Sequence, residues 1–433
     1  PIFVDKDAIA GANNGSSWTD AFLNLQDGLA AATPRRTIWV AAGTYTPVRP
    51  GSPGQRTDSF AMKKGVGVYG GFDATETARD QRDPGLNLTI LTGEIGNPGT
   101  ATDNCYHVFY HSGSPVLDGS AVLDGFIISD GWADGGGDDD YGGGMFNNSG
   151  SPTISGCTFI GNYADQGGGM YNQVGAAPTV SGCLFDGNSA TNGGGMYNAP
   201  TTAPVINSGT FSNNSAIGGW GWGDGGGIYN KNNDAVIEGV AFINNTSTWE
   251  GGGAFNDLGT TPSYTGCTFW GNDAVYGGGM FIDDTDPPIT ACDFFYNTAN
   301  YGAGIYTNSC GSLIDSSNFV ANAADIDGGG IYNYEFSGNI TQCTFGGALS
   351  GDGNSSIQHG GGIYNYSSSP SITGCLFWNN SGSQGGGMYN ANYSHAVITS
   401  GTFMNNVAWD SGGGIYSSQN FGDFSGSDII LTG

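Results

Sequence analysis

A glycine triplet that recurs eleven times after residue 141 constrains the fold of this chain more than any other feature. Each triplet is followed by an aliphatic and then an aromatic residue, and successive triplets lie 25 to 27 residues apart except for two intervals of 32. A recurrence of this length is typical of a solenoid, in which every repeat packs its apolar side against the next one. The triplets begin at Gly142, Gly167, Gly193, Gly225, Gly251, Gly277, Gly302 (with Ala303 as the middle residue), Gly328, Gly360, Gly385 and Gly412.

The second half of each repeat contains a phenylalanine that is followed three positions later by an asparagine. Short alternating segments such as 154–159 are interrupted by Gly, Asn, Ser and Pro, which indicates strands and corners and not helices. Phe345 has no asparagine at this spacing. The complete pairs are Phe159/Asn162, Phe185/Asn188, Phe211/Asn214, Phe242/Asn245, Phe269/Asn272, Phe294/Asn297, Phe319/Asn322, Phe377/Asn380 and Phe403/Asn406.

Strands that pair in parallel with the same strand one coil later describe an all-β, right-handed parallel β-helix. Coils would lie about 4.8 Å apart, so eleven would form a rod about 50 Å long. We expect the corner asparagines to bond along the stack. The aliphatic residues should point inward, and alternation would turn the aromatic residues outward as an exposed stripe that marks an interaction site. The inward residues are Met145, Met170, Met196, Ile228, Met280, Ile305, Ile331, Ile363, Met388 and Ile415; the outward ones are Phe146, Tyr171, Tyr197, Tyr229, Phe255, Phe281, Tyr306, Tyr332, Tyr364, Tyr389 and Tyr416.

The first 140 residues are less regular. Apolar residues at helical spacing predict one short amphipathic helix over 21–32, after a Ser or Thr cap, and this helix would cover the apolar end of the solenoid. We divide the chain into a cap (1–36), irregular first coils (37–140) and regular repeats (141–433). Strands of the irregular coils are expected at 37–44, 65–72, 88–91, 106–110 and 121–128.

The pairing of a Gly-Gly-Gly-Ile/Met element with a Phe-x-x-Asn element resembles the repeat of chlamydial polymorphic outer-membrane proteins and of bacterial surface proteins in the pectin-lyase-like β-helix superfamily. The resemblance covers roughly residues 140–420. Segments 37–45 and 68–72 also look like the N-terminal portion of secreted bacterial β-helix proteins. The resemblance implies a β-helix, and because this architecture carries adhesins, enzymes and structural fibres alike, it does not choose among these functions.

Charge excludes one class of partner. The formal net charge is −28 with only ten Lys and Arg, and Lys231 is the single basic residue after Arg82. Nucleic acid is therefore not an expected partner, because binding it requires many phosphates to be neutralised. No apolar run is long enough to span a membrane and no signal peptide is visible. The first residue, Pro1, suggests a processed product, which fits an extracellular or cell-surface location.

The same distribution bears on enzymatic activity. Pectate lyases of the resembled superfamily use a basic residue beside calcium, and polygalacturonases use clustered aspartates near a basic pair. The regular repeats offer only Lys231, interpreted as a solvated loop lysine, and the four histidines of the chain are scattered: His107, His111, His359 and His395. A glycosidase needs only two suitably spaced carboxylates, which Asp283, Asp284 and Asp286, or Asp138, Asp139 and Asp140, could supply. The same two triplets are candidate calcium ligands.

Six of the eight cysteines lie two positions before a repeat phenylalanine, and their parity points them into the core. Two interpretations stay open: three disulfides between adjacent coils, or buried free thiols. We favour free thiols, because in-register strands hold Cβ atoms further apart than a disulfide prefers. The adjacent pairs are Cys157 with Cys183, Cys267 with Cys292, and Cys343 with Cys375; Cys105 and Cys310 lie elsewhere.

Both 32-residue intervals place their extra residues between the phenylalanine and the next triplet, at 217–224 and 346–359. Insertions at one corner often mark the binding edge of a solenoid. Aromatic and acidic residues at that corner suit sugar rings or calcium, although aromatic residues also shield backbone at crowded turns. The candidate binding edge consists of Trp220, Trp222, Asp224, Trp249, Glu250 and Trp409.

From these features we expect a non-catalytic secreted or cell-surface β-helix protein that acts as an adhesive or structural element. Its partners would be cell-surface glycans or copies of itself, since the apolar run 428–433 offers a strand edge for filament formation. The alternative is a carbohydrate-active enzyme, a polysaccharide hydrolase before a lyase. Calcium is the only cofactor that the acidic residues suggest.

Overall fold

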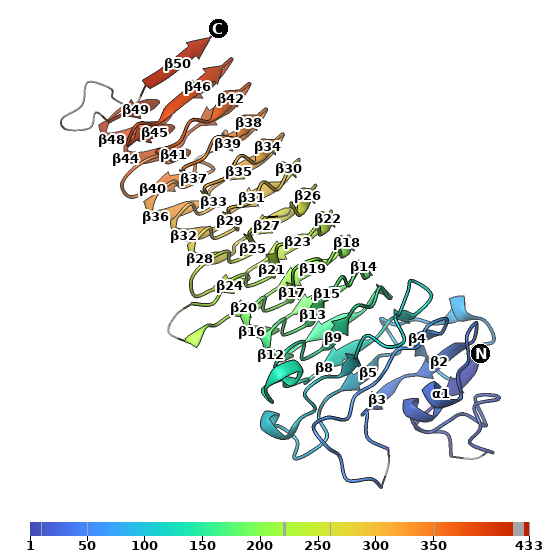
Figure 1. The fold of residues 1–433 in the computed structure, drawn as a ribbon. Helices are drawn as coiled ribbons and strands as arrows, with labels where there is room; N and C mark the ends of the chain where they lie inside the picture. The colour runs from blue at the N-terminus through green and yellow to red at the C-terminus, as the bar shows by residue number, and fades with distance from the viewer. Residues whose placement is uncertain are drawn as a thin grey trace. The chain divides into compact units, whose positions relative to one another are not determined.

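The computed structural model describes residues 1–433 apart from residues 10, 50, 220, 221, 260, 350, 419–427 and 433. It confirms the expected fold class, a right-handed parallel β-helix whose strands pair in parallel with the corresponding strands of neighbouring coils. Contacts divide the chain into two compact units, Pro1–Thr210 and Phe211–Gly433, which we call unit 1 and unit 2. Figure 1 shows the strands of each unit as stacked parallel arrows.

A regular coil contains four short strands separated by corners. We number the sheets by the order of their strands after a glycine triplet. In one coil of unit 2 these strands are β25 (Ala254–Asp257) in sheet 1, β26 (Ser263–Thr265) in sheet 2, β27 (Thr268–Trp270) in sheet 3 and β28 (Asp273–Tyr276) in sheet 4.

Unit 1 begins with larger, less regular coils. Each of the five segments predicted there contains a strand, and corners divide 37–44 and 121–128 into two strands each. Sheet 1 has β6 (Phe109–His111), β9 (Met145–Asn148), β13 (Met170–Gln173) and β17 (Met196–Asn198); sheet 2 has β1 (Ile2–Val4), β2 (Thr37–Ala41), β4 (Gly67–Phe72), β7 (Val122–Asp124), β10 (Thr153–Ser155), β14 (Thr179–Ser181) and β18 (Val205–Asn207); sheet 3 has β3 (Gly43–Tyr45), β5 (Thr89–Thr92), β8 (Ile127–Ser129), β11 (Thr158–Ile160) and β15 (Leu184–Asp186); sheet 4 has β12 (Tyr163–Gln166) and β16 (Ser189–Asn192). Short 3-10 helices are η1 (Arg79–Gln81), η2 (Ala101–Asp103) and η3 (Gly137–Asp140).

Unit 2 repeats the four-strand coil. Sheet 1 has β21 (Ile228–Lys231), β25, β29 (Met280–Asp283), β33 (Ile305–Asn308), β37 (Ile331–Tyr334), β41 (Ile363–Tyr366), β45 (Met388–Ala391) and β49 (Ile415–Ser417); sheet 2 has β22 (Val236–Glu238), β26, β30 (Ile289–Thr290), β34 (Leu313–Asp315), β38 (Asn339–Thr341), β42 (Ser371–Thr373), β46 (His395–Thr399) and β50 (Asp428–Thr432). Sheet 3 has β19 (Thr210–Ser212), β23 (Ala241–Ile243), β27, β31 (Asp293–Phe295), β35 (Asn318–Val320), β39 (Thr344–Gly346), β43 (Leu376–Trp378) and β47 (Thr402–Met404); sheet 4 has β20 (Ser215–Ala216), β24 (Thr246–Ser247), β28, β32 (Thr298–Tyr301), β36 (Ala323–Asp327), β40 (Ser355–Ser356), β44 (Ser381–Gln384) and β48 (Val407–Ser411).

The N-terminal helix α1 (Leu25–Ala31) is shorter than the predicted segment 21–32. Its cap is Asn24, whose side chain accepts from the Asp27 amide, and not a Ser or Thr. The helix buries Leu25, Gly28 and Leu29, and a Cβ at Gly28 would lie 2.7 Å from a methyl group of Val4. This close approach to β1 requires glycine at the position.

The glycine triplet is needed because consecutive coils meet backbone to backbone there. At the triplet that begins with Gly251, the first glycine has φ +63°, and a Cβ on Gly252 would lie 2.5 Å from the carbonyl oxygens of Asp273 and Gly278. A Cβ on Gly252 would therefore require the neighbouring coil to shift, and only the triplet at Gly302 carries a larger residue, Ala303, at this position. The recurrence that predicts the fold is therefore a direct consequence of coil-to-coil contact.

Two side-chain ladders inside the coils confirm the sequence prediction. The inward aliphatic residues from Met145 to Met388 are buried, whereas Ile415 is half-buried. Repeat phenylalanines stack with ring centroids 4.6 to 4.9 Å apart from Phe242 to Phe345. The core of each unit is thus a column of near-identical residues.

The asparagine ladder fills one corner. In unit 2, Asn245 donates through both its backbone N–H and its Nδ2 to Oδ1 of Asn272, at 3.0 Å each, and its Nδ2 also donates to the carbonyl of Phe211 at 2.8 Å. The repeat of Phe345, which lacks an asparagine three positions later, continues the ladder with Asn354: this residue accepts from Asn322 and donates to Asn380. The inserted residues therefore lie between Phe345 and Asn354.

This finding corrects the expectation that both insertions lie at one corner. The first lies after the ladder residue Asn214, between β20 and Asp224, whereas the second lies between β39 and β40, before the ladder is resumed. Only the first insertion therefore borders the corner where the candidate binding edge was placed.

All eight cysteines are buried free thiols, as we favoured from the sequence. The Cys267 thiol lies 3.6 Å from the carbonyl oxygen of Thr265, two residues earlier, to which it donates a weak hydrogen bond. Burial raises the pKa of the Cys105 and Cys310 thiols. In the described part of the chain, no helix is long and apolar enough to cross a membrane.

Candidate functional site

Three parallel rows of side chains run along sheet 1 of unit 2 and along the corner that leads into it from sheet 4. The leading row is the residue before each glycine triplet, the ring row is the repeat aromatic residue, and the trailing row lies two positions after the ring. The leading row consists of Asp224, Glu250, Tyr276, Tyr301, Asp327, His359 and Gln384; the ring row of Tyr229, Phe255, Phe281, Tyr306, Tyr332, Tyr364 and Tyr389; and the trailing row of Lys231, Asp257, Asp283, Asn308, Tyr334, Tyr366 and Ala391.

Backbone pairing holds the leading row in register. Asp224 bridges to Glu250 and Glu250 bridges to Tyr276, and the carbonyl of Glu250 accepts from the Gly225 amide at 2.9 Å. Further along the row, His359 bridges to Asp327 and to Gln384. The residue before each triplet is therefore carried at the same place on successive coils.

The ring row corrects the prediction of an exposed aromatic stripe. Its rings stack along the unit, as in the pair Phe281 and Tyr306 with centroids 4.9 Å apart at 4°, but most are buried: Phe281 is 4% exposed and Tyr364 7%. Stacked neighbours cover the ring faces, and leading-row rings cover their edges. Tyr276 packs edge-to-face on Tyr306 with a centroid distance of 5.4 Å at 80°. The alternation along a strand predicts whether a side chain points inward or outward, but it does not predict whether neighbouring side chains bury it.

A hollow of about 310 Å³ opens where the rows pass through the middle of unit 2. The leading row lines it with Glu250 and Tyr276, and the ring row lines it with Phe281 and Tyr306. The trailing row forms the opposite wall with Asn308 and Tyr334, and Trp249, from the corner before Glu250, completes the lining. The hollow thus combines five aromatic residues with one carboxyl and one amide group.

Glu250 is the titratable centre of this hollow. Burial raises the pKa of its carboxyl to about 8, and the nearby carboxylates Asp224, Asp283 and Asp257 act in the same direction, against a hydrogen bond from the Trp249 side chain. Burial also raises the pKa of Asp224 to about 6. Removing a carboxylate from water and placing it among like charges disfavours its ionised form. Glu250 is therefore a neutral acid over most of the physiological pH range.

The remaining acids of the trailing row have partners. Asp257 accepts from the Tyr229 hydroxyl at 2.9 Å and lies 3.8 Å from the Lys231 ammonium. Asp283 accepts from the Asn308 amide at 2.6 Å, and its pKa is raised, chiefly by burial. The interpretation of Lys231 as a loop residue is wrong, because Lys231 ends strand β21 and pairs with Asp257.

The structure brings four of the six candidate edge residues together. The rings of Trp222 and Trp249 lie 5.4 Å apart, and Asp224 and Glu250 are neighbours in the leading row. Trp222 is 63% exposed at the end of this group. Trp409, also exposed, lies on β48, six strands along sheet 4 from β24, which is about 29 Å at the usual strand spacing. Trp220 lies outside the described residues.

Neither acidic triplet assembles a cation site. Among the described residues no group of three or more His, Cys, Asp or Glu side chains could hold a metal ion. Asp138, Asp139 and Asp140 lie on the surface helix η3 of unit 1. Asp283 points into the trailing row, Asp284 has φ +46°, and Asp286 accepts from the Gly311 amide. These positions give no support to the calcium expectation.

Two histidines have partners that their sequence positions did not indicate. In unit 2, His359 Nδ1 lies 2.8 Å from Oδ1 of Asp327, and its ring packs on Tyr389 at 4.5 Å. In unit 1, burial lowers the pKa of His107, whose Nε2 lies 3.5 Å from Asp139. The sequence signal that would find His359 and the whole trailing row is variation at fixed offsets from the triplet, because constant positions hold the coil and variable ones face outward.

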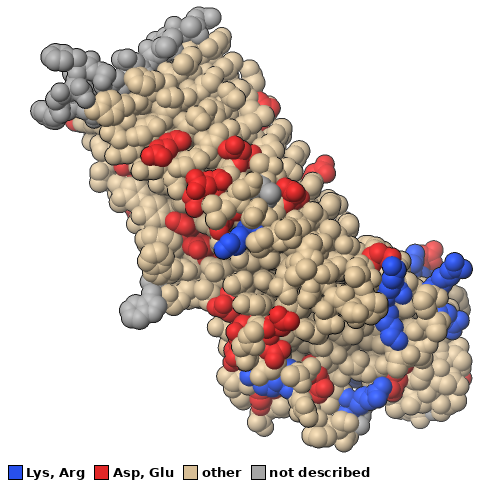
Figure 2. All heavy atoms as spheres, viewed as in Figure 1, with Lys and Arg blue, Asp and Glu red and all other residues tan. Residues whose placement is uncertain are grey.

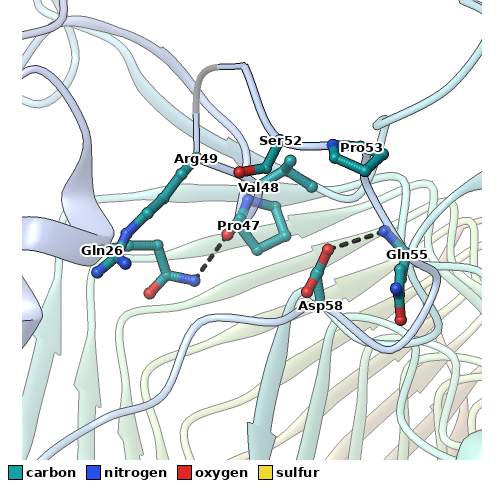
Figure 3. Close-up of a pocket in the computed structure, with 8 residues that line it drawn as sticks. All are labelled: Gln26, Pro47, Val48, Arg49, Ser52, Pro53, Gln55 and Asp58. Carbon is teal, nitrogen blue, oxygen red and sulfur yellow. Dashed lines mark hydrogen bonds between the residues drawn. The ribbon is translucent and has the colours of Figure 1, made fainter.

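Unit 1 contains its own hollows, and they have a different character. One hollow, of about 460 Å³, lies between helix α1 and the loop that follows β3. There the Gln26 side chain donates a hydrogen bond to the Pro47 carbonyl at 2.8 Å, and Arg49 lies beside it (Figure 3). Another, of about 730 Å³, is lined by Arg35, Lys63 and Lys64. Figure 2 shows most of the basic side chains over the N-terminal coils, whereas acidic side chains lie over both the N-terminal coils and the later strands.

No protein-family model matches the sequence, and no curated protein matches it. Among solved structures, the chain is similar to one described as Geobacillus virus E2 ORF18, with 11% identity and a TM-score of 0.22. The likeness covers 92% of this chain and 62% of that one, so the chain spans less than two thirds of that structure's length. A TM-score of this size carries no argument about fold or function.

Proposed function

We propose that the protein is a non-catalytic secreted or cell-surface β-helix protein that acts as an adhesive or structural element, and that it binds glycans through the three rows of unit 2. The observation that carries this proposal is the hollow lined by Trp249, Tyr276 and Glu250, where aromatic rings stand beside groups that donate and accept hydrogen bonds. Concave sites that combine apolar walls with a few fixed polar groups are typical ligand sites. Copies of the same chain remain the second partner that we propose.

The scaffold suits this role because its rows hold ligand-facing residues at fixed intervals. Each coil contributes one residue to every row, and the asparagine and phenylalanine ladders fix the coils beneath them. A repeat protein of this kind presents an extended surface whose outer residues vary while its core does not. The superfamily that the sequence resembles includes adhesins, which agrees with this proposal.

Retention on insoluble polysaccharides tests the proposal. We expect the protein to be retained on at least one of cellulose, chitin, mannan or xylan, and Trp249→Ala to reduce retention at least tenfold, because this ring lines the hollow. Trp270→Ala is the matched control, since Trp270 is 45% exposed on sheet 3 and lines no part of the hollow. Equal retention of wild type and Trp249→Ala, or retention on none of the four, would contradict the proposal.

A second candidate function, polysaccharide hydrolysis, is favoured by one observation. Glu250 is a neutral carboxylic acid beside Asp224, and Asp283 acts on it from the trailing row. An acid that stays protonated next to carboxylates is the pairing that glycosidases use, with one group as proton donor and the other as base or nucleophile. Release of new reducing ends from a bound polysaccharide, abolished in Glu250→Gln, would establish the hydrolase and replace the non-catalytic proposal.

A further inference from the structure

The hollow of unit 2 has no charged group in its lining at neutral pH. Its seven lining residues include one carboxylic acid, Glu250, whose pKa is raised to about 8. The acids behind it are engaged, Asp257 with Lys231 and Tyr229, and Asp283 with Asn308. A ligand in the hollow therefore meets hydroxyl, amide and carboxylic acid groups, which match the hydroxyl groups of an uncharged polyol.

The surrounding charge opposes an anionic ligand. Unit 2 holds a single basic residue, Lys231, and this residue faces Asp257. A uronate or sulfated sugar placed beside Glu250 would lie near Asp224, Asp257 and Asp283 without a cation to offset its charge. Like charges at close range are unfavourable, more so where water is partly excluded.

The ring row also disfavours a cationic ligand held by ring faces. Phe281 and Tyr306 stack on each other at 4.9 Å, and Tyr306 stacks on Tyr332 at 4.7 Å, so their faces are already occupied. A cation binds to the electron-rich face of a ring, whereas the ring edge is positive. The stacked faces of the ring row are therefore not open to an ammonium or guanidinium group.

We infer that this hollow binds an uncharged glycan, with the Glu250 carboxylic acid donating a hydrogen bond to a sugar oxygen, an inference that rests on the glycan-binding function proposed above. The acid must stay protonated to donate this bond. Ionisation would remove the donor and add a charge to a group already surrounded by acids. The charged and titratable groups that act on Glu250 or line the hollow with it are Asp224 before β21, Asp257 on β25, Tyr276 on β28, Asp283 on β29, Tyr306 on β33 and Tyr334 on β37; Lys231 on β21 pairs with Asp257 behind them.

Calorimetric titration at pH 6.5 and 9.5 tests the inference, with cellohexaose, mannohexaose, xylohexaose and chitohexaose as neutral probes, hexagalacturonate as the anion and hexalysine as the cation. We expect at least one neutral hexasaccharide to bind at pH 6.5. Its affinity should fall about thirtyfold at pH 9.5, because only the protonated fraction of an acid of pKa about 8 can bind it. Hexagalacturonate should bind at neither pH.

Two variants separate the acid from general effects of pH. Glu250→Gln keeps a neutral donor of the same shape, so it should bind the neutral probe equally at both pH values. Glu238→Gln makes the same change at an exposed position on β22 and should retain the full pH dependence of the wild type. Circular dichroism at each pH confirms that all three proteins are folded.

Binding of hexalysine that strengthens at pH 9.5, binding of hexagalacturonate comparable to that of the neutral probe, or a pH dependence retained in Glu250→Gln would overturn the inference. If no soluble neutral probe binds while the protein is still retained on insoluble polysaccharide through Trp249, the inference fails and the proposed function stands. If retention is absent as well, both fail.

Discussion

Carboxyl groups respond to their surroundings in opposite ways in the two units. In unit 1 the shifted acids have lowered pKa values: hydrogen bonds from Ser120 and Lys64 lower that of Asp118 to about 2, and backbone and hydroxyl donors lower those of Asp20 and Asp73. In unit 2 burial raises the pKa values of Asp224, Glu250 and Asp283 instead. The same residue type is stabilised as an anion in one region and as a neutral acid in the other.

The distribution of basic residues explains part of this difference. Nine of the ten Lys and Arg residues lie in unit 1, where the Lys64 ammonium lies 2.9 Å from Asp118 and contributes to its lowered pKa. Unit 2 has only Lys231, so acids that its coils bring together must be desolvated beside one another. Acids that are buried close together without cations lower the stability of the folded state. Such an arrangement is typical of functional sites, which suggests a function for the leading and trailing rows.

The largest expected effect tests whether the coils of unit 2 behave as one stack. Ile331→Asp places a carboxylate at a fully buried position between Ile305 and Ile363 of the neighbouring coils. We expect a loss of about 3–5 kcal/mol in the free energy of unfolding, because a buried charge without a partner is strongly destabilising. Urea denaturation measures it. Leu313→Asp, at an outward position of β34, is the control; equal effects of the two changes would disprove the inward assignment.

The asparagine ladder is expected to give the next largest effect. Asn272→Ala removes the acceptor of two hydrogen bonds from Asn245 and leaves these buried donors unpaired. Each unsatisfied buried group costs about 1–3 kcal/mol, so we predict about 2–4 kcal/mol in total by urea denaturation. Asn318→Ala, at an exposed position on β35, should change stability far less. A loss below about 0.5 kcal/mol would mean that water replaces the ladder.

The opposite pKa shifts predict a pH dependence that one substitution can isolate. Because the folded pKa of Glu250, about 8, exceeds its ordinary value of 4.5, the folded state holds more protons between these values. Its contribution to stability is therefore complete in acid and decreases as pH rises from about 4.5 to about 8. Glu250→Gln should flatten the decline in melting temperature over this interval. An unchanged slope would show that Glu250 ionises normally in the folded protein.

The acids of unit 1 should act in the other direction. Asp118 has a folded pKa of about 2, so its contribution is present above its ordinary value of 3.8 and is lost as pH falls toward 2. Asp118→Asn should lower the melting temperature slightly at neutral pH, where the contribution of the carboxylate is complete, and should reduce the further loss between pH 4 and 2. A steeper decline in this variant would contradict the assignment.

The smallest effect is expected at Lys231, the only Lys or Arg residue of unit 2. Its ammonium lies 3.8 Å from Asp257 and the side chain is 42% exposed, so the pair is worth about 0–1 kcal/mol. Lys231→Gln should change the urea midpoint little, and 0.5 M salt should remove most of the difference. A loss of several kcal/mol would show that this pair carries far more of the stability of the row than surface ion pairs do.

Much of the fold was predictable because the coils impose a strict spacing. The triplet period, the Phe-x-x-Asn pairs and the inward aliphatic residues predicted the parallel β-helix and its core, since each is a local requirement that repeats. The candidate site was predictable only in part. Trp222, Asp224, Trp249 and Glu250 were found because an insertion drew attention to their corner, whereas Asn308 and Tyr334 of the opposite wall were missed.

The sequence by itself determined what is periodic: the coil, its glycine corners, its stacked phenylalanines and its asparagine ladder. Tertiary structure decided which side chains are buried by their neighbours. The ring row was expected outside and is buried, because rings of the neighbouring rows pack on it. Asn354 completes the ladder from a position that no fixed spacing predicts. Glu250 acquires its raised pKa only when separate coils bring Asp224, Asp257 and Asp283 around it, since desolvation and charge proximity exist only in the assembled fold.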